Sequence, residues 1–159
     1  MGVTRLNHAV LFVRDAEVAA EFYGRVFGFR NLGAPPGMRA AFMRADGTDN
    51  HHDLGLFEVG ANAVKPPRGS IGLYHLAWEV DTIEELARMA DELSSAGALT
   101  GTSDHGVSKS LYARDPDGNE FEVMWAVPRE AWDANSDEAV IRPLNLEAEL
   151  ARWGARASA

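Results

Sequence analysis

Four polar side chains in this sequence of 159 residues are of types that bind metal ions or move protons: His8, His52, His75 and Glu122. Glu122 lies in the stretch 120–125, where alternation places it on one face of a strand with Glu120 and Met124. A carboxylate at such a position is costly to bury unless it is paired or bound to a metal. Two neutral imidazoles and one carboxylate form the facial-triad ligand set, which leaves three adjacent positions open and suits the oxygen chemistry of Fe(II). His8, His75 and Glu122 are therefore candidate metal ligands.

An internal repeat relates the two candidate histidine ligands. At an offset of 67 positions, Leu6-Asn7-His8 falls on Leu73-Tyr74-His75, and Val13 falls on Val80. A single histidine in an apolar strand is more often a core residue with satisfied hydrogen bonds than a ligand. Related halves usually pack about a local two-fold axis, so that equivalent inward positions can meet at one centre. The pair thus favours a shared site.

The elements that must position these residues are predicted by the same repeat. Residues 4–13 and 72–80 have the composition of strands, and each is followed by a helix whose start is marked by a capping residue, Asp15 or Thr82. Apolar residues at helical spacing predict the buried faces of the two helices: Val18, Phe22 and Val26 in the first, and Ile83, Leu86, Met89, Ala90 and Leu93 in the second. Further strands are predicted over 39–44, 53–59, 108–114 and 120–126.

The predicted fold is therefore α+β, built from two βαβββ modules over about 4–59 and 72–126 that together occupy 1–127. Residues 60–70, with Pro66-Pro67, are interpreted as the linker between modules. In the tail, 128–159, Leu146, Leu150 and Trp153 have the spacing of a short amphipathic helix. We expect this helix to pack on the outside of a sheet or on a partner subunit, with a lid over a pocket as the alternative.

Charge and composition exclude several classes of function. There are 24 acidic and 15 basic residues, a net charge of −9, and this argues against nucleic acid or an anionic membrane as the main partner. The absence of cysteine excludes disulfides, thiolate metal sites and a cysteine nucleophile. No apolar stretch is long enough to cross a bilayer, and the N-terminus lacks the apolar region of a secretion signal. A cytoplasmic location is the expectation.

The doubled βαβββ pattern and three motifs resemble the vicinal oxygen chelate superfamily, which includes extradiol dioxygenases, glyoxalase I, epimerases, fosfomycin-resistance enzymes and bleomycin-binding proteins. The motifs are residues 6–10 (LNHAV), 73–78 (LYHLAW) and 115–122 (DPDGNEFE), and the resemblance covers about 4–127. It implies that the two modules form a half-barrel or cup, and that His8, His75 and Glu122 are the metal ligands.

Within the superfamily, residues 50–56 resemble the His-His segment of extradiol dioxygenases. That resemblance implies an acid–base role for His52, a substrate-orienting role for Tyr112, which lies ten positions before Glu122, and a place in the pocket for His105. It implies Fe(II)-dependent cleavage of a catechol-type aromatic diol by O2, with Mn(II), Ni(II) or Zn(II) as alternative metals. Many extradiol dioxygenases have a second pair of modules, whereas this sequence has one pair.

Two other functions stay open from the sequence. One is a glyoxalase- or epimerase-like isomerase or lyase that uses Ni, Co or Zn. Glu58 would be its fourth ligand if the strand that carries it is regular from His52 onwards. The other is a metal-free protein that sequesters a cationic antibiotic such as bleomycin. The net negative charge fits this function, but it assigns no role to the three candidate metal ligands. The substituents of a substrate are not fixed by the sequence, and a homodimer is left open.

Overall fold

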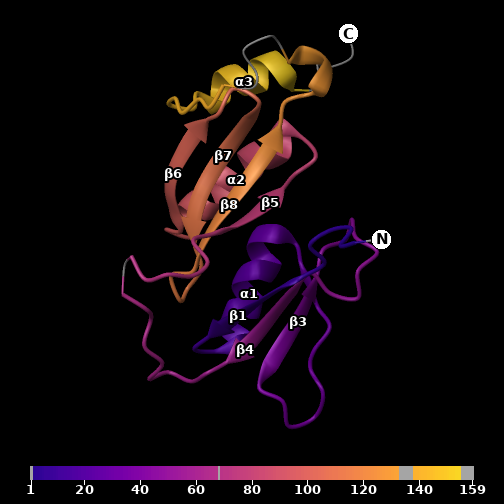
Figure 1. Ribbon diagram of the computed structural model, residues 1–159, viewed down its shortest axis with the longest axis vertical. Coiled ribbons are helices and arrows are strands. Elements are labelled where there is room, and N and C mark those ends of the chain that lie inside the picture. Colours follow the sequence, from indigo (N-terminus) through magenta and orange to yellow (C-terminus); the bar gives the residue numbers. More distant parts are fainter. Residues whose placement is uncertain (1, 68, 133–137, 155–159) are drawn as a thin grey trace. The chain divides into compact units, whose positions relative to one another are not determined.

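The computed structural model describes residues 2–67, 69–132 and 138–154, and the chain divides into two compact units, 1–71 and 72–159 (Figure 1). Each unit contains one four-stranded sheet. The mixed α+β class, the two βαβββ modules and a C-terminal helix confirm the fold predicted from the sequence. Among the described residues, no helix combines the length and apolar character that a membrane span requires.

The first unit contains five elements in the predicted order. They are β1 (Ala9–Val13), α1 (Ala16–Phe27), β2 (Arg30–Asn31), β3 (Ala40–Arg44) and β4 (Leu54–Glu58). The strand order in the sheet is β1-β4-β3-β2, in which β1 runs parallel to β4 and the other neighbours are antiparallel.

The second unit repeats this arrangement and adds the tail. Its elements are β5 (Leu76–Glu79), α2 (Ile83–Ser95), β6 (Leu99–Asp104), β7 (Ser108–Arg114), β8 (Glu120–Ala126), the short 3-10 helix η1 (Arg129–Ala131) and α3 (Leu146–Trp153). The strand order is β5-β8-β7-β6, again with one parallel pair, β5 and β8.

The repeat extends to the register of the sheets. Ala9 of β1 is paired with Leu54 of β4, and Leu76 of β5 is paired with Phe121 of β8. Both residues of the second pair lie 67 positions after those of the first. The same offset matches Gly55 of the first sheet with Glu122 of the second, so the acidic side chain has no counterpart in the first unit.

Helix α1 covers one face of the first sheet through six buried side chains: Ala16, Ala19, Ala20, Phe22, Tyr23 and Val26. Asp15 caps its N-terminus, as predicted, by accepting from the backbone N–H of Glu17 and Val18. The prediction that Val18 belongs to the buried face is wrong, because its side chain is 50% exposed and Tyr23 is buried instead. The helix ends at Gly28, whose φ of 69° is left-handed.

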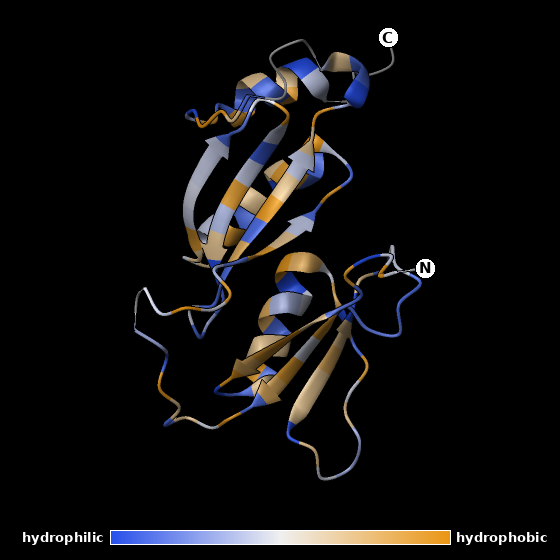
Figure 2. Cartoon of the chain, viewed as in Figure 1, coloured by the Kyte–Doolittle hydropathy of each residue, from blue (hydrophilic) through white to orange (hydrophobic). Residues whose placement is uncertain are grey.

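Helix α2 buries Ile83, Leu86, Met89 and Leu93 of the predicted stripe, and Thr82 caps its N-terminus by accepting from the N–H of Glu85. Phe121, Val123 and Trp125 of β8 are buried, while the residues between them stay half-buried. Each sheet therefore has a covered face and an open face. In Figure 2, apolar colours dominate the strands of the first sheet, whose open face carries Val10 and Phe12.

The first strand of each module is shorter than predicted. Residues 4–8 and 72–75 precede β1 and β5, because strand pairing starts only at Ala9 and Leu76. His8 and His75 thus each stand one residue before a strand. The strands β2 and β6 had no predicted range, since Arg30-Asn31 is too short to show a pattern and β6 is rich in Gly, Ser and Thr.

Helix α3 packs within the second unit on the side of α2. The rings of Trp153 and Trp125 lie 5.9 Å apart, and Glu149 lies 3.6 Å from the ammonium of Lys109. Because Trp125 belongs to the covered face of β8, α3 does not lie over the open face that carries Glu122. The packing interpretation of the tail helix therefore fits the second unit, and within that unit α3 is not a lid over the open face of the sheet.

Candidate functional site

In the first unit, two of the predicted site residues lie against each other. The rings of His8 and His52 have their centroids 4.5 Å apart, and the ring of Phe42 on β3 lies 4.9 Å from that of His52. His8 precedes β1 by one residue, and its exposed side chain lies against the ring of His52. The first unit thus brings the candidate ligand and the candidate base together.

A chain of amides fixes the orientation of the His8 ring. Asp53 is buried and accepts from the amide nitrogen of Asn50, which orients Asn50 so that its oxygen faces the amide nitrogen of Asn7 at 2.8 Å. The oxygen of Asn7 then lies 2.9 Å from His8 Nδ1. Since that oxygen can only accept, Nδ1 carries the hydrogen and Nε2 is left with its lone pair, which is the form that binds a metal.

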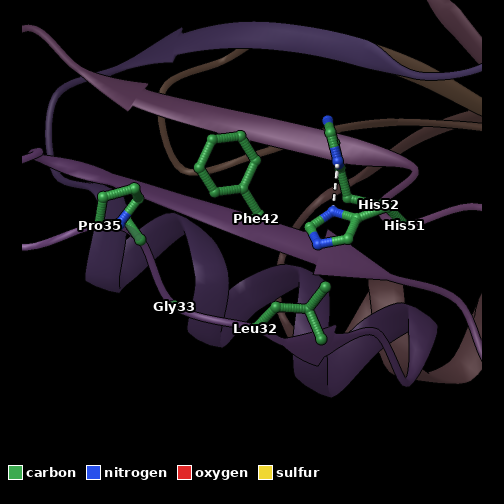
Figure 3. Close-up of a pocket in the computed structure, with 7 residues that line it drawn as sticks. Leu32, Gly33, Pro35, Phe42, His51 and His52 are labelled. Carbon is green, nitrogen blue, oxygen red and sulfur yellow. Dashed lines mark hydrogen bonds between the residues drawn. The ribbon is translucent and has the colours of Figure 1, made fainter.

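An apolar pocket of about 360 Å³ lies beside His52 in this unit. It is lined by Leu32, Gly33, Ala34, Pro35, Phe42, His51 and His52. Figure 3 shows the His52 ring and the Phe42 ring on one side of the pocket and the segment from Leu32 to Pro35 on the other. The volume and lining suit an aromatic or aliphatic group of modest size.

The environment of His52 favours its neutral form. Burial lowers the pKa of the His52 imidazole, and the charges of His8 and His51 lower it further, while Asp53 acts in the opposite sense. Its Nδ1 lies 3.1 Å from Nδ1 of His51, so that one of the two rings donates to the other. A neutral imidazole can accept a proton, which is the requirement for a general base.

The second unit brings four other predicted residues together. His75 Nε2 and Glu122 Oε2 are 3.2 Å apart, and both side chains are largely covered, with exposed fractions of 29% and 14%. Two adjacent ligands of a six-coordinate ion with bonds of about 2.1 Å are separated by roughly 3.0 Å. The pair therefore fits two neighbouring positions on a first-row metal ion, and its donor types match two members of the facial triad.

Tyr112 lies directly opposite Glu122 in the pairing of β7 with β8, and its ring centroid is 6.1 Å from that of His75. Burial raises the pKa of the Tyr112 phenol, and the charge and hydrogen-bond acceptance of Glu122 raise it further. His105 Nε2 lies 2.8 Å from the phenol oxygen. Tyr112 is thus a protonated phenol held between a carboxylate and an imidazole.

The predicted site residues are divided between the units: His8 and His52 in the first, and His75, His105, Tyr112 and Glu122 in the second. Within the described part of either unit, no group of three His, Asp or Glu side chains is placed to hold a metal ion. Convergence of the full ligand set on one ion stays a prediction.

The suggestion that Glu58 shares a face with His52 is not supported. Strand β4 begins only at Leu54, so its alternation does not extend back to His52. The Glu58 carboxylate forms an ion pair with Arg39 and lies 3.5 Å from the N–H of Ala16 at the start of α1, which places it on the helix side of the sheet. The carboxylate is therefore already paired, and it is not available as a fourth ligand in this arrangement.

Sequence reasoning missed Asn7, Asn50 and Asp53, which orient the His8 ring. The only signal in the sequence was the position of Asn50 and Asp53 beside the histidine pair 51–52, and the structure shows that both are largely buried. Buried polar side chains are hydrogen-bonded in native proteins, so their role is structural support for the residues between and beside them.

The description "Glyoxalase/Bleomycin resistance protein/Dioxygenase superfamily" belongs to a family profile that matches residues 5–123. The chain belongs to this superfamily. The superfamily's doubled module accounts for the repeated sheet register described above, and the family resemblance inferred from the sequence motifs is confirmed.

Curated relatives in the superfamily include named dioxygenases. A catechol-2,3-dioxygenase of Bacillus subtilis is 35% identical over 135 residues, which cover 84% of this chain and 46% of the relative. A biphenyl-2,3-diol 1,2-dioxygenase of Rhodococcus globerulus is 31% identical over 134 residues, covering 81% of this chain and 68% of the relative. The chain thus spans less than half the length of the first of these proteins and about two thirds of the second.

Solved structures with low sequence identity share the superfamily fold. A glyoxylase/bleomycin resistance protein/dioxygenase domain from Frankia matches with a TM-score of 0.66 and 22% identity over 80% of this chain and 96% of that one. The fosfomycin resistance protein FosX of Listeria monocytogenes matches with a TM-score of 0.62 and 17% identity over 82% of this chain and all of the other. At these identities the likeness concerns the fold alone.

Proposed function

We propose that this member of the superfamily is an Fe(II)-dependent extradiol dioxygenase that opens a catechol-type ring with O2. His8, His75 and Glu122 are its metal ligands. The observation that carries the proposal is the separation of 3.2 Å between His75 Nε2 and Glu122 Oε2, with Tyr112 directly opposite Glu122 in the sheet. The relatives named as catechol and biphenyl-diol dioxygenases support the choice of reaction.

The proposed role of the metal is to bind the two reactants next to each other. When bound, Fe(II) in a facial triad supplies open adjacent positions for the two oxygens of a catechol and for O2. The hydrogen bond from His8 Nδ1 to Asn7 leaves Nε2 as the ligand atom. Because catechol and O2 would then be held side by side at the protein, their reaction would not require a simultaneous encounter of three molecules in solution.

The remaining roles fall to residues of the chain itself. His52, in contact with the His8 ring, is the base that removes a proton from a catechol hydroxyl and returns it later. Tyr112 accepts a hydrogen bond from a catechol hydroxyl at its phenol oxygen and fixes the orientation of the ring. The apolar pocket beside Phe42 receives the part of the substrate that carries no oxygen.

Oxygen uptake by iron-loaded protein tests the proposal. The protein is loaded with Fe(II) under anaerobic conditions and exposed to air with catechol, 3-methylcatechol or 2,3-dihydroxybiphenyl. Stoichiometric iron, catechol-dependent O2 consumption and a yellow ring-opened product are expected. Glu122→Gln is expected to lose the iron and the activity. Glu120→Gln is the matched control, because Glu120 lies on the same face of β8 and is paired with Arg114.

Two outcomes would overturn the proposal. Activity under nitrogen on a thiol adduct of an α-ketoaldehyde would assign the chain to the isomerases. Tight bleomycin binding by protein that retains no metal would assign it to the drug-binding proteins. A cytoplasmic location is still a prediction from the sequence, and a homodimer and the replacement of Fe(II) by Mn(II), Ni(II) or Zn(II) are still alternatives.

A further inference from the structure

A short part of the tail lies beside the candidate site in the second unit. Residues 140–142, here called the tail segment, join the edge of the sheet at β6. The backbone N–H of Asp104 donates to the carbonyl of Arg142 at 2.8 Å, and the N–H of Arg142 donates to the carbonyl of Asp104 at 2.9 Å. The next residue after Asp104 is His105, whose Nδ1 lies 2.8 Å from the carbonyl oxygen of Val140.

The hydrogen bonds of His105 have only one consistent assignment in its neutral form. A backbone carbonyl can only accept, so Nδ1 of His105 must carry a hydrogen and donate it to Val140. Nε2 of the neutral ring then has a lone pair and must accept. Its partner is the hydroxyl of Tyr112 at 2.8 Å, which therefore donates to His105.

Tyr112 has one hydroxyl proton, and its neighbours include two groups that can only accept it, His105 Nε2 and the carboxylate of Glu122, its partner across the strand pair. The hydroxyls of Ser103 and Ser110, which also lie beside the phenol, can instead donate to its oxygen. If the proton points to His105, the Glu122 carboxylate keeps its lone pairs for another partner. If the proton points to Glu122, that carboxylate is partly occupied. The tautomer of His105 decides between these arrangements.

We infer that the tail segment is a positioning element of the site. The carbonyl of Val140 holds His105 in the Nδ1–H tautomer, which draws the Tyr112 hydroxyl proton away from Glu122 and leaves the Glu122 carboxylate, 3.2 Å from His75 Nε2, to accept from other partners such as a cation. That Glu122 binds a cation rests on the proposed function. The tautomer assignment stands on hydrogen bonds within the second unit.

The structure also explains how the tail segment is held in place. On one side it is paired to Asp104, whose carboxylate forms an ion pair with the buried ammonium of Lys109. On the other side it leads into α3, where Glu149 approaches the same ammonium. Gly106, with a φ of 76°, allows the tight turn after His105, and the His105 N–H donates to the carbonyl of Ser108. The His105 ring is therefore carried by a turn that hydrogen bonds and ion pairs hold in place.

The tautomer can be read directly by nitrogen NMR. Uniformly ¹⁵N-labelled, metal-free protein is studied at about pH 8, where an ordinary histidine is neutral. The two ring nitrogens of each histidine are then distinguished by which one carries the hydrogen, and the signals of His105 are assigned by their loss in His105→Gln. We expect the Nδ1–H form in the wild type. The Nε2–H form in the wild type would overturn the inference without any further variant.

A matched pair of variants tests the tail segment itself. Arg142→Pro removes the backbone N–H that donates to Asp104, whereas Arg142→Ala removes the exposed side chain and keeps that N–H. We expect His105 to stay Nδ1–H in Arg142→Ala and to become a mixture of tautomers in Arg142→Pro. A folded Arg142→Pro protein with an unchanged tautomer would overturn the role of the tail segment.

Metal affinity tests the link to Glu122. Zn(II) alone is titrated calorimetrically into the metal-free variants, because it needs no exclusion of air. We expect binding to Arg142→Pro to be about tenfold to a hundredfold weaker than to Arg142→Ala, the range found when a residue that supports a metal ligand is removed. Equal affinities would overturn the link. The NMR and binding measurements do not require dioxygenase activity, so their outcome is separate from that of the proposed function.

Discussion

Replacement of Asn50 by alanine should destabilise the first unit markedly. Asn50 is 8% exposed, and its side chain joins Asp53, the guanidinium of Arg5, and both the backbone carbonyl and the amide nitrogen of Asn7. A hydrogen bond to a charged group contributes about 1.5–3 kcal/mol and a neutral one about 1 kcal/mol. Arg5 and Asn7 are exposed, so water replaces part of what is lost on that side. We therefore expect a destabilisation of about 3 kcal/mol, or about 150-fold in the opening equilibrium.

Hydrogen exchange measured by mass spectrometry can localise this effect. Amides in 40–58 of Asn50→Ala should lose about 150-fold of their protection, whereas amides in 108–126 of the second unit should be unchanged. Asn31→Ala is the control, because Asn31 is exposed and its side-chain oxygen accepts from the N–H of Gly33 two residues away. A loss of less than about tenfold in 40–58, or an equal loss in both regions, would refute the assignment of Asn50 as the centre of the network.

Three further predictions concern separate features. His52→Phe should keep the iron but slow ring cleavage by about a hundredfold or more, as measured with the oxygen electrode, and an unchanged rate would remove His52 from the reaction. Burial alone would raise the pKa of Asp104, but hydrogen bonds from Lys109 and the N–H of Gly106 lower it on balance. The ionised carboxylate therefore stabilises the fold above about pH 4, and this stabilisation is lost as the pH falls through the lowered pKa of the folded state. Between pH 6 and pH 3, the free energy of unfolding measured with urea should fall less in Asp104→Asn than in the wild type. Gly28→Ala should cost about 1 kcal/mol in the same assay, because φ there is 69°, and equal stability would contradict the left-handed end of α1.

The parts of the fold that the sequence predicts well are those with strong local signals. The capping residues Asp15 and Thr82, the buried stripe of α2 and the bounds of β7 and β8 all follow from short-range patterns. Val18 was assigned wrongly because three-residue spacing alone does not determine the centre of a buried face. The shorter β1 and β5 reflect pairing with β4 and β8, which starts later than the apolar pattern does.

The contacts of the site depend on tertiary structure in a way that spacing cannot show. The sequence indicated His75, Glu122 and Tyr112, and register brings them together in one sheet. It could not indicate the carbonyl of Val140, because a backbone group has no residue type and lies 35 positions from His105. It also could not show that Arg39 and the start of α1 occupy Glu58.

The correspondence of Gly55 with Glu122 has a consequence for how the chain tolerates cleavage. The duplication has lost its functional symmetry, since one half supplies an acidic group where the other has only a hydrogen atom as side chain. Under the proposed ligand set, neither fragment produced by a protease acting between residues 60 and 71 would retain a full complement of donors. Iron retention after a single nick there would then require the two fragments to stay associated.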